Sequence, residues 1–158
     1  MKIRKIQPKD NQKIEEIVKS AIIEFGLPTT GSAYEDSDTN AMYEAFLDDN
    51  AIYFVIEDDN EVIGGGGVKP LQGQDNDICE LQKMYLIPSA RGKGYGKKIF
   101  DICLSAAKEL GYKQCYLESD PGMTIAIKIY ENNGFKHLTG PIGNTGHTAC
   151  GIWMIKDL

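Results

Sequence analysis

The feature that most constrains the fold of this chain is a glycine-rich segment placed between an apolar stretch and an amphipathic helix. The segment reads Arg-Gly-Lys-Gly-Tyr-Gly-Lys-Lys over residues 91–98, and it follows the apolar run 84–88. Apolar side chains then recur at three- and four-residue spacing from Ile99 to Leu110, which predicts a helix with one buried face. Gly111 is placed to end that helix in the left-handed conformation. The pattern therefore predicts a strand, a tight loop and a helix.

The start of this helix is predicted to bind an anion. The first-turn N–H groups of a helix have no helical partner, and the summed peptide dipoles place roughly half a positive charge there. Gly92, Gly94 and Gly96 carry no Cβ, so the backbone at these positions can approach a bulky phosphate. Four cations flank the glycines: Arg91, Lys93, Lys97 and Lys98. We therefore predict a phosphate-bearing ligand.

Two other phosphate-binding loops fit this segment less well. The P-loop pattern requires a glycine where Arg91 stands and a Ser or Thr where Lys98 stands, so it is excluded. The dinucleotide fingerprint requires G-x-G-x-x-G directly after the strand, whereas here the glycines read G-x-G-x-G and residues 87–91 intervene. Glu118, near the end of the next predicted strand, follows the glycines at a sequence spacing that suits the acidic residue that binds the ribose in that fingerprint. A Rossmann-type oxidoreductase therefore stays an alternative. The other alternative is that the glycines form a turn with a purely structural role.

The segment 91–96 resembles the R/Q-x-x-G-x-G/A signature of the Gcn5-related N-acetyltransferase (GNAT) superfamily, whose loop holds the pyrophosphate of acetyl-coenzyme A. Upstream, residues 80–86 resemble the fourth strand of that family. Downstream, residues 126–135 resemble its A-x-x-x-Y-x-x-x-G-F segment. The three segments follow one another in the family order, and the resemblance is firm over about residues 78–136.

The resemblance implies a site for the coenzyme and two catalytic side chains. The coenzyme would be held by Met84, Tyr85, Leu86, Arg91, Gly92, Lys93, Gly94, Tyr95, Gly96 and Lys97. Tyr130 stands where the family has the tyrosine that protonates the leaving thiolate, and Glu80 stands where many relatives have a glutamate that accepts the proton of the amine. A backbone N–H near Met84 would stabilise the oxyanion. Met123 replaces an asparagine that many relatives use to contact the coenzyme arm, which puts that contact in doubt.

Reasoning from the residues alone leaves both catalytic roles open. Helical spacing also allows Tyr130 to complete the apolar face of its helix. Glu80 could equally be a rim glutamate paired with a lysine. Strand alternation predicts that Glu80, Gln82, Met84 and Leu86 lie on one face of their strand, unless a bulge intervenes. His137 and His147 are interpreted as ordinary surface or loop histidines, and no metal-ligand cluster is predicted.

The resemblance thus implies an acetyl-CoA-dependent N-acetyltransferase that moves an acetyl group to a primary amine by direct attack. A non-catalytic acyl-CoA-binding or sensing module of the same fold is the alternative. The acceptor pocket would be made by residues 24–47 and 139–147, where no motif identifies the acceptor. Acidic clusters such as 35–38 could attract a cationic amine, although solvated surface explains them as well. The resemblance also allows a homodimer, an assembly that is common in the family.

Composition limits the class of protein further. The 158 residues predict a single N-acetyltransferase domain spanning 1–158, and the net charge of −6 disfavours a nucleic-acid partner. No stretch resembles a signal peptide or a membrane span, which predicts a cytoplasmic protein without membrane contact. The cysteines lie in apolar segments without C-x-x-C spacing and are predicted to be reduced core residues: Cys79, Cys103, Cys115 and Cys150.

The predicted fold class is α/β (α+β), a GNAT-like mixed, mainly antiparallel seven-stranded sheet flanked by four helices. Strands are predicted at 2–7, 51–57, 61–69, 114–119, 135–138 and 147–155. A further strand, the fourth in chain order, is predicted to begin after residue 77. Helices are predicted from about 10 to 25, from 37 to 47, up to Gly111, and from Pro121 to Gly134. The run of four glycines at 64–67 inside one strand predicts either a bend or a close approach to the backbone, such as by a substrate.

Overall fold

The computed structural model describes residues 1–158, which form one seven-stranded sheet in the order β1-β2-β3-β4-β5-β7-β6. The strands are β1 (Lys2–Lys5), β2 (Ile52–Asp58), β3 (Glu61–Pro70), β4 (Ile78–Leu86), β5 (Gln114–Ser119), β6 (Lys136–His137) and β7 (Ile152–Asp157). Only β4 and β5 pair in parallel, which agrees with the predicted mixed, mainly antiparallel sheet. Because every other pair is antiparallel, the doubly wound parallel sheet of a Rossmann-type oxidoreductase is excluded.

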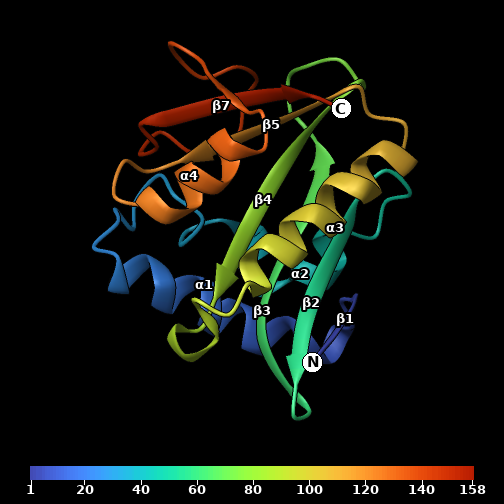
Figure 1. The fold of residues 1–158 in the computed structure, drawn as a ribbon, viewed down its shortest axis with the longest axis vertical. Coiled ribbons are helices and arrows are strands. Elements are labelled where there is room, and N and C mark those ends of the chain that lie inside the picture. Colours follow the sequence, from blue (N-terminus) through green and yellow to red (C-terminus); the bar gives the residue numbers. More distant parts are fainter.

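Helices cover both faces of the sheet (Figure 1). They are α1 (Asn11–Glu24), α2 (Met42–Ala45), α3 (Tyr95–Glu109) and α4 (Thr124–Asn132). One core lies between α1 and the sheet, and it contains Ile14, Val18, Ile22, Tyr53 and Val55. A second core lies on the opposite face under α3 and contains Ile56, Leu81, Ile99, Phe100 and Cys103. The four predicted helices and the two-sided sheet are confirmed. No helix is long and apolar enough to cross a bilayer.

A β-bulge in β4 changes which side chains face each core. The pairing of β3 with β4 shifts register between Gly65 and Gly67, and Lys83 opposite this point has a φ of +48°. Before the bulge, Cys79 and Leu81 pack in the α3-side core. After it, the side chains that pack against that core are Met84 and Leu86, whereas Tyr85 packs against the α1-side core. Glu80, Gln82, Met84 and Leu86 were predicted to share one face only in the absence of a bulge; the extra residue reverses the alternation, so they do not share one.

Two of the four glycines of β3, Gly65 and Gly67, make room for the ring of Tyr53. A Cβ on Gly67 would lie 2.7 Å from Cδ2 of Tyr53 and 2.5 Å from the carbonyl oxygen of Ile52. A Cβ on Gly65 would lie 2.8 Å from the Tyr53 hydroxyl. That hydroxyl donates a 2.8 Å hydrogen bond to the carbonyl of Lys83, the residue at the bulge. The close approach to these glycines thus comes from a side chain of the protein itself.

Three predicted elements end or begin elsewhere. The segment 37–47 forms a 3-10 turn (Ser37–Asn40) and the short α2 in place of one continuous helix. The helix predicted from Pro121 begins at Thr124, because Asp120 Oδ1 accepts the N–H of Gly122 at 2.8 Å in a local turn. The last strand begins at Ile152, and residues 147–151 fold over the site as a loop, held by a 3.1 Å bond from the Ala149 N–H to the Gly31 carbonyl.

The glycine run yields the first prediction. Gly67→Ala should lower the free energy of unfolding by about 2 kcal/mol, because the new methyl group collides with backbone and with the Tyr53 ring. Gly140→Ala, where a Cβ meets nothing within 4 Å, is the matched control and should change stability by less than about 0.5 kcal/mol. Urea unfolding measures both. Equal stability of the two variants would contradict this explanation of the glycine run.

Candidate active site

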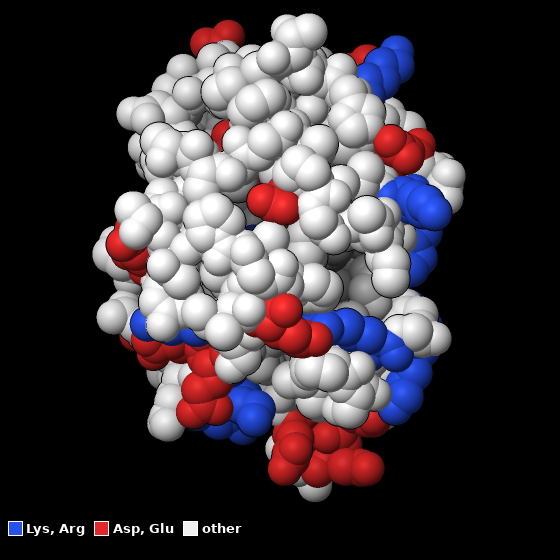
Figure 2. Space-filling view, turned by 90° about the vertical axis from the view of Figure 1, so that its left-hand side faces the viewer, with Lys and Arg blue, Asp and Glu red and all other residues white.

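The candidate site lies where β4 and β5 separate. The two strands pair only from Ile78 to Glu80 on β4, so the next residues of each strand face a gap. Figure 1 shows β5 turning away from β4 at this point. A pocket fills the gap, lined by residues 80–85 of β4, by residues 117–119 of β5 and by Asp120, which follows β5. Figure 2 shows the side of the molecule that lies on the left in Figure 1. Its surface is hollowed near the middle, and Lys and Arg side chains lie along one edge. The gap offers an unpaired strand edge to an extended ligand.

A run of unpaired backbone N–H groups lies at the start of α3. None of the six amides from Gly92 to Lys97 donates a hydrogen bond within the protein, and the first amide of the helix to do so is that of Lys98, to the Gly94 carbonyl. Gly92 has a φ of +73° and Gly94 a φ of +79°, conformations that favour glycine. A Cβ at either position would meet nothing within 4 Å, so both face open space. The loop has the free donors and the exposure that phosphate oxygens require.

The side chains around this loop differ in how free they are. The Arg91 guanidinium binds Glu24 at 2.7 and 2.8 Å and also donates to the Leu86 carbonyl, so it holds the loop against α1 and the end of β4. Lys97 pairs with Asp101 on the next turn of α3. Lys93 forms no ion pair and stays exposed. Of the cations predicted to bind the coenzyme, Lys93 is the one left unpaired. The carbonyl of Leu86, another residue predicted to bind the coenzyme, already accepts hydrogen bonds from Arg91.

Glu80 is a buried carboxyl in the pocket wall. It is 3% exposed, and it accepts a hydrogen bond from the side-chain amide of Gln82. Burial raises the pKa of Glu80 to about 7, although the hydrogen bond from Gln82 acts in the opposite direction. The carbonyl oxygen of the Gln82 side chain has no donor in the protein. The pair therefore presents two acceptors to a ligand, one of which can take up a proton near neutral pH.

Tyr130 lies on α4 and lines the same pocket as Met84 and Glu80. Its ring packs against Phe100 and Phe135, with centroids 5.7 and 6.0 Å away, so its position is fixed by the α3-side core. Burial raises the pKa of the Tyr130 hydroxyl, which keeps it protonated at neutral pH. Met123, just before α4, also lines the pocket. The structure thus brings together both predicted catalytic side chains, Tyr130 and Glu80.

A charged cluster that sequence reasoning missed closes the pocket on the α1 side. Lys83 has a side chain only 3% exposed, and its Nζ lies 3.0 Å from Oδ2 of Asp36. The same carboxylate oxygen lies 2.7 Å from Nε2 of His147. Burial alone would lower the pKa of His147, but the hydrogen bond and the charge of Asp36 outweigh it and raise the pKa. His147 does lie in a loop, as interpreted, but its side chain is only 12% exposed and is paired with Asp36, whereas His137 is exposed.

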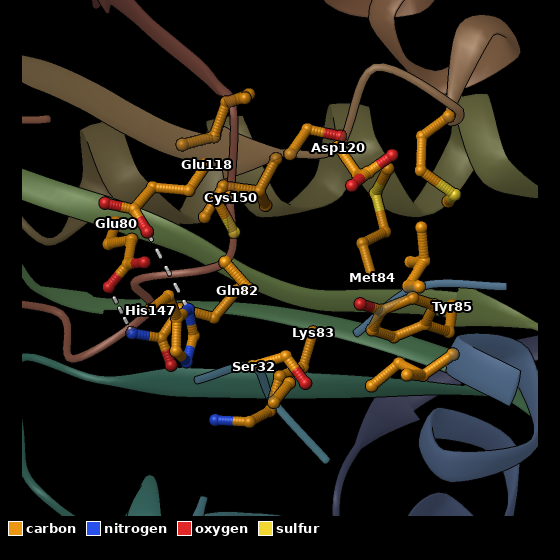
Figure 3. Close-up of a pocket in the computed structure, with 18 of the residues that line it drawn as sticks. Ser32, Glu80, Gln82, Lys83, Met84, Tyr85, Glu118, Asp120, His147 and Cys150 are labelled. Atoms are coloured by element: carbon orange, nitrogen blue, oxygen red, sulfur yellow. Dashed lines mark hydrogen bonds and ion pairs between the residues drawn. The ribbon is translucent and has the colours of Figure 1, made fainter. Parts of the chain in front are cut away.

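Cys150 also departs from its prediction. Cys79, Cys103 and Cys115 are buried in the core, but Cys150 is only half-buried and lines the pocket together with His147 and Glu118 (Figure 3). Burial and the surrounding carboxylates, Glu118 first among them, raise the pKa of its thiol to about 12. The sequence signal for these residues was the spacing His-x-x-Cys in a glycine-rich stretch directly before the last strand.

Three comparisons with known proteins relate the chain to acetyltransferases. Residues 16–135 match the model of the acetyltransferase (GNAT) family. The uncharacterized N-acetyltransferase YjgM of Escherichia coli K12 is 39% identical over 158 residues, which cover 99% of this chain and 94% of that protein. A GNAT-family acetyltransferase structure from Staphylococcus aureus Mu50 superposes with a TM-score of 0.87 at 19% identity, covering 99% and 98% of the two chains. A putative Salmonella typhimurium acetyltransferase with acetyl-CoA gives 0.80 at 20% identity, covering 99% and 93%.

The buried Glu80 makes the stability of the protein depend on pH. Its folded-state pKa lies above the ordinary value of 4.5, so Glu80 contributes stability that is fully present below pH 4.5 and lost as the pH rises through about 7. A rise from 4.5 to about 7 corresponds to a loss of about 3 kcal/mol. We therefore expect Glu80→Gln to become more stable relative to the wild type as the pH increases across this range, because the amide cannot ionise.

Urea unfolding at several pH values measures this difference. Glu61→Gln, at an exposed position on β3, is the matched control and should follow the wild-type pH dependence. A Glu80→Gln curve that runs parallel to the wild type from pH 4.5 to above 7 would show that Glu80 is not held in a desolvated site.

Proposed function

Because the chain belongs to the acetyltransferase (GNAT) family, we propose that it transfers the acetyl group of acetyl-coenzyme A to a primary amine by direct attack. The observation that carries this proposal is the run of free amides from Gly92 to Lys97 at the end of the gap between β4 and β5. These donors suit the diphosphate of the coenzyme. A ligand arm that leaves the loop along the gap would pass Met84 and Tyr85 and bring a thioester to the pocket that contains Glu80 and Tyr130.

Glu80 serves as the general base in this mechanism. A primary ammonium group has to lose a proton before its nitrogen can attack a thioester carbonyl. The carboxylate of Glu80 accepts that proton, directly or through a water molecule, and its pKa of about 7 leaves it able to do so near neutral pH. The free carbonyl oxygen of Gln82 offers a second acceptor for the N–H groups of the same amine. Both groups hold the amine at the wall of the pocket.

Tyr130 serves as the general acid. When the nitrogen–carbon bond has formed, the tetrahedral intermediate collapses, the carbon–sulfur bond breaks, and the thiolate of coenzyme A leaves. The Tyr130 hydroxyl donates its proton to that sulfur, and a backbone N–H of β4 near Met84 stabilises the oxyanion before the collapse. The Tyr130 hydroxyl is protonated at neutral pH, so it has a proton to donate when the thiolate forms. The products are the N-acetylated amine and free coenzyme A.

The charges of the pocket favour an amine as the acceptor. The acidic side chains that line it are Glu80, Glu118 and Asp120. The lysine in the lining, Lys83, is paired with Asp36. The wall therefore attracts a cation more strongly than an anion. This preference supports transfer to an amine of low molecular mass or to a peptide amino group.

Substitution of Tyr130 tests the proposal. Tyr130→Phe keeps the ring in its aromatic packing and removes the acid, so kcat for acetyl transfer to an amine panel should fall about a hundredfold or more while the Kd for coenzyme A stays unchanged. Tyr112→Phe removes a hydroxyl from the same core far from the pocket, where it bonds to Asn50, and is the matched control.

Two other results would overturn parts of the proposal. Wild-type turnover by Tyr130→Phe would show that another group protonates the thiolate. Coenzyme A binding by the wild type without transfer to any amine in a broad panel would favour the non-catalytic acyl-CoA-binding module.

A further inference from the structure

Three side chains from distant parts of the sequence meet in the pocket wall away from Tyr130. Glu118 stands on β5, whereas His147 and Cys150 belong to the loop that precedes β7. One ligand atom from each, a carboxylate oxygen, an imidazole nitrogen and the thiol sulfur, lie within 4.8 Å of one another. Oε2 of Glu118 is 3.8 Å from Nδ1 of His147 (Figure 3). None of these three side chains takes part in the proton transfers of the acetyl-transfer mechanism.

Neighbouring residues orient two of the three side chains. Nε2 of His147 lies 2.7 Å from Asp36, whose carboxylate can only accept, so Nε2 carries the hydrogen. In neutral His147 the lone pair is therefore on Nδ1, the nitrogen that faces Glu118. The carboxylate of Glu118 is fixed in turn by hydrogen bonds from Tyr116 at 2.7 Å and Thr145 at 2.9 Å. Histidine and carboxylate ligands of protein-bound zinc are oriented by outer hydrogen bonds of this kind.

The composition and charge of the cluster suit a borderline-soft divalent cation. A thiol, an imidazole and a carboxylate are the donor types that bind zinc, whereas magnesium and calcium prefer oxygen ligands alone. Zinc bonds of about 2.0–2.3 Å in a tetrahedral site place donor atoms about 3–4 Å apart, so the side chains would close by about 1 Å.

We propose that Glu118, His147 and Cys150 bind one divalent transition-metal ion of the zinc class, with a fourth coordination position open to the pocket. Cys150 loses its thiol proton to solvent when the sulfur–metal bond forms, and His147 binds through Nδ1. Asp36 is a positioning residue that keeps the tautomer of His147. The site does not depend on acetyl transfer, and metal binding can be measured without coenzyme or amine.

A protonated His147 bridging Asp36 and Glu118 is the arrangement that competes with a metal ion. It satisfies both carboxylates by charge, but it gives the Cys150 thiol no part in the cluster. The two arrangements therefore differ in what Cys150 does. A readout that reports a sulfur–metal bond separates them.

The test is a titration of the full chain, stripped with a chelator and kept reduced without added thiols, with Co²⁺. We expect one equivalent to bind, a thiolate-to-cobalt charge-transfer band to appear, and Zn²⁺ to displace the cobalt. Cys150→Ser should abolish the band, and His147→Ala and Glu118→Gln should each weaken binding at least tenfold. Asp36→Asn should weaken it about 10- to 100-fold, as loss of an outer-shell partner does.

Two control variants address the same residue types outside the site. His137→Ala removes the other histidine, which is exposed and pairs with Glu131, and Cys103→Ala removes a buried core thiol. Both should bind Co²⁺ as the wild type does. Circular dichroism verifies that every variant is folded. Absence of the charge-transfer band in the wild type, or its persistence in Cys150→Ser, would overturn the proposal.

Discussion

The site depends on the bulge at Lys83, because it decides which side chains of β4 face which side of the sheet. An extra residue in one strand reverses the alternation, so Glu80 and Gln82 lie on the face opposite to Met84 and Leu86, which pack towards α3. Lys83 holds a left-handed conformation that is costly for a residue with a Cβ, and two contacts stabilise it. They are the hydrogen bond from the Tyr53 hydroxyl to its carbonyl and the ion pair of its Nζ with Asp36.

The same bulge links the glycine run of β3 to the pocket. Tyr53 reaches the Lys83 carbonyl only because its ring crosses strand positions that have no Cβ. Immediately beyond the bulge, β4 has no partner on its β5 side, and its last carbonyl is fixed by Arg91. Arg91 is tied to Glu24 of α1, so the start of α3 is held at the end of the gap. The free amides therefore follow directly on the end of β4, the strand that carries the buried carboxyl of Glu80 in the pocket wall.

The sequence predicted the parts of the fold that depend on local patterns. The apolar periodicity of α3, the glycines that precede it and the strand at 114–119 all follow from neighbouring residues, and the structure has them where they were expected. The start of α4 was misplaced because the Asp120 side chain bonds to Gly122 in a turn instead of capping a helix. The bulge and the cluster around His147 were missed because both depend on contacts between residues thirty or more positions apart.

The account rests on the free amides at the start of α3 as the place where the diphosphate of coenzyme A binds. An NMR titration of the protein with coenzyme A tests this most directly, because each amide reports its own hydrogen bond. The account predicts large shifts of the signals from Gly92 to Lys97, with the amides of Gly111 and Tyr112 at the other end of α3 unmoved. Saturating coenzyme A that leaves the Gly92–Lys97 signals in place would contradict it.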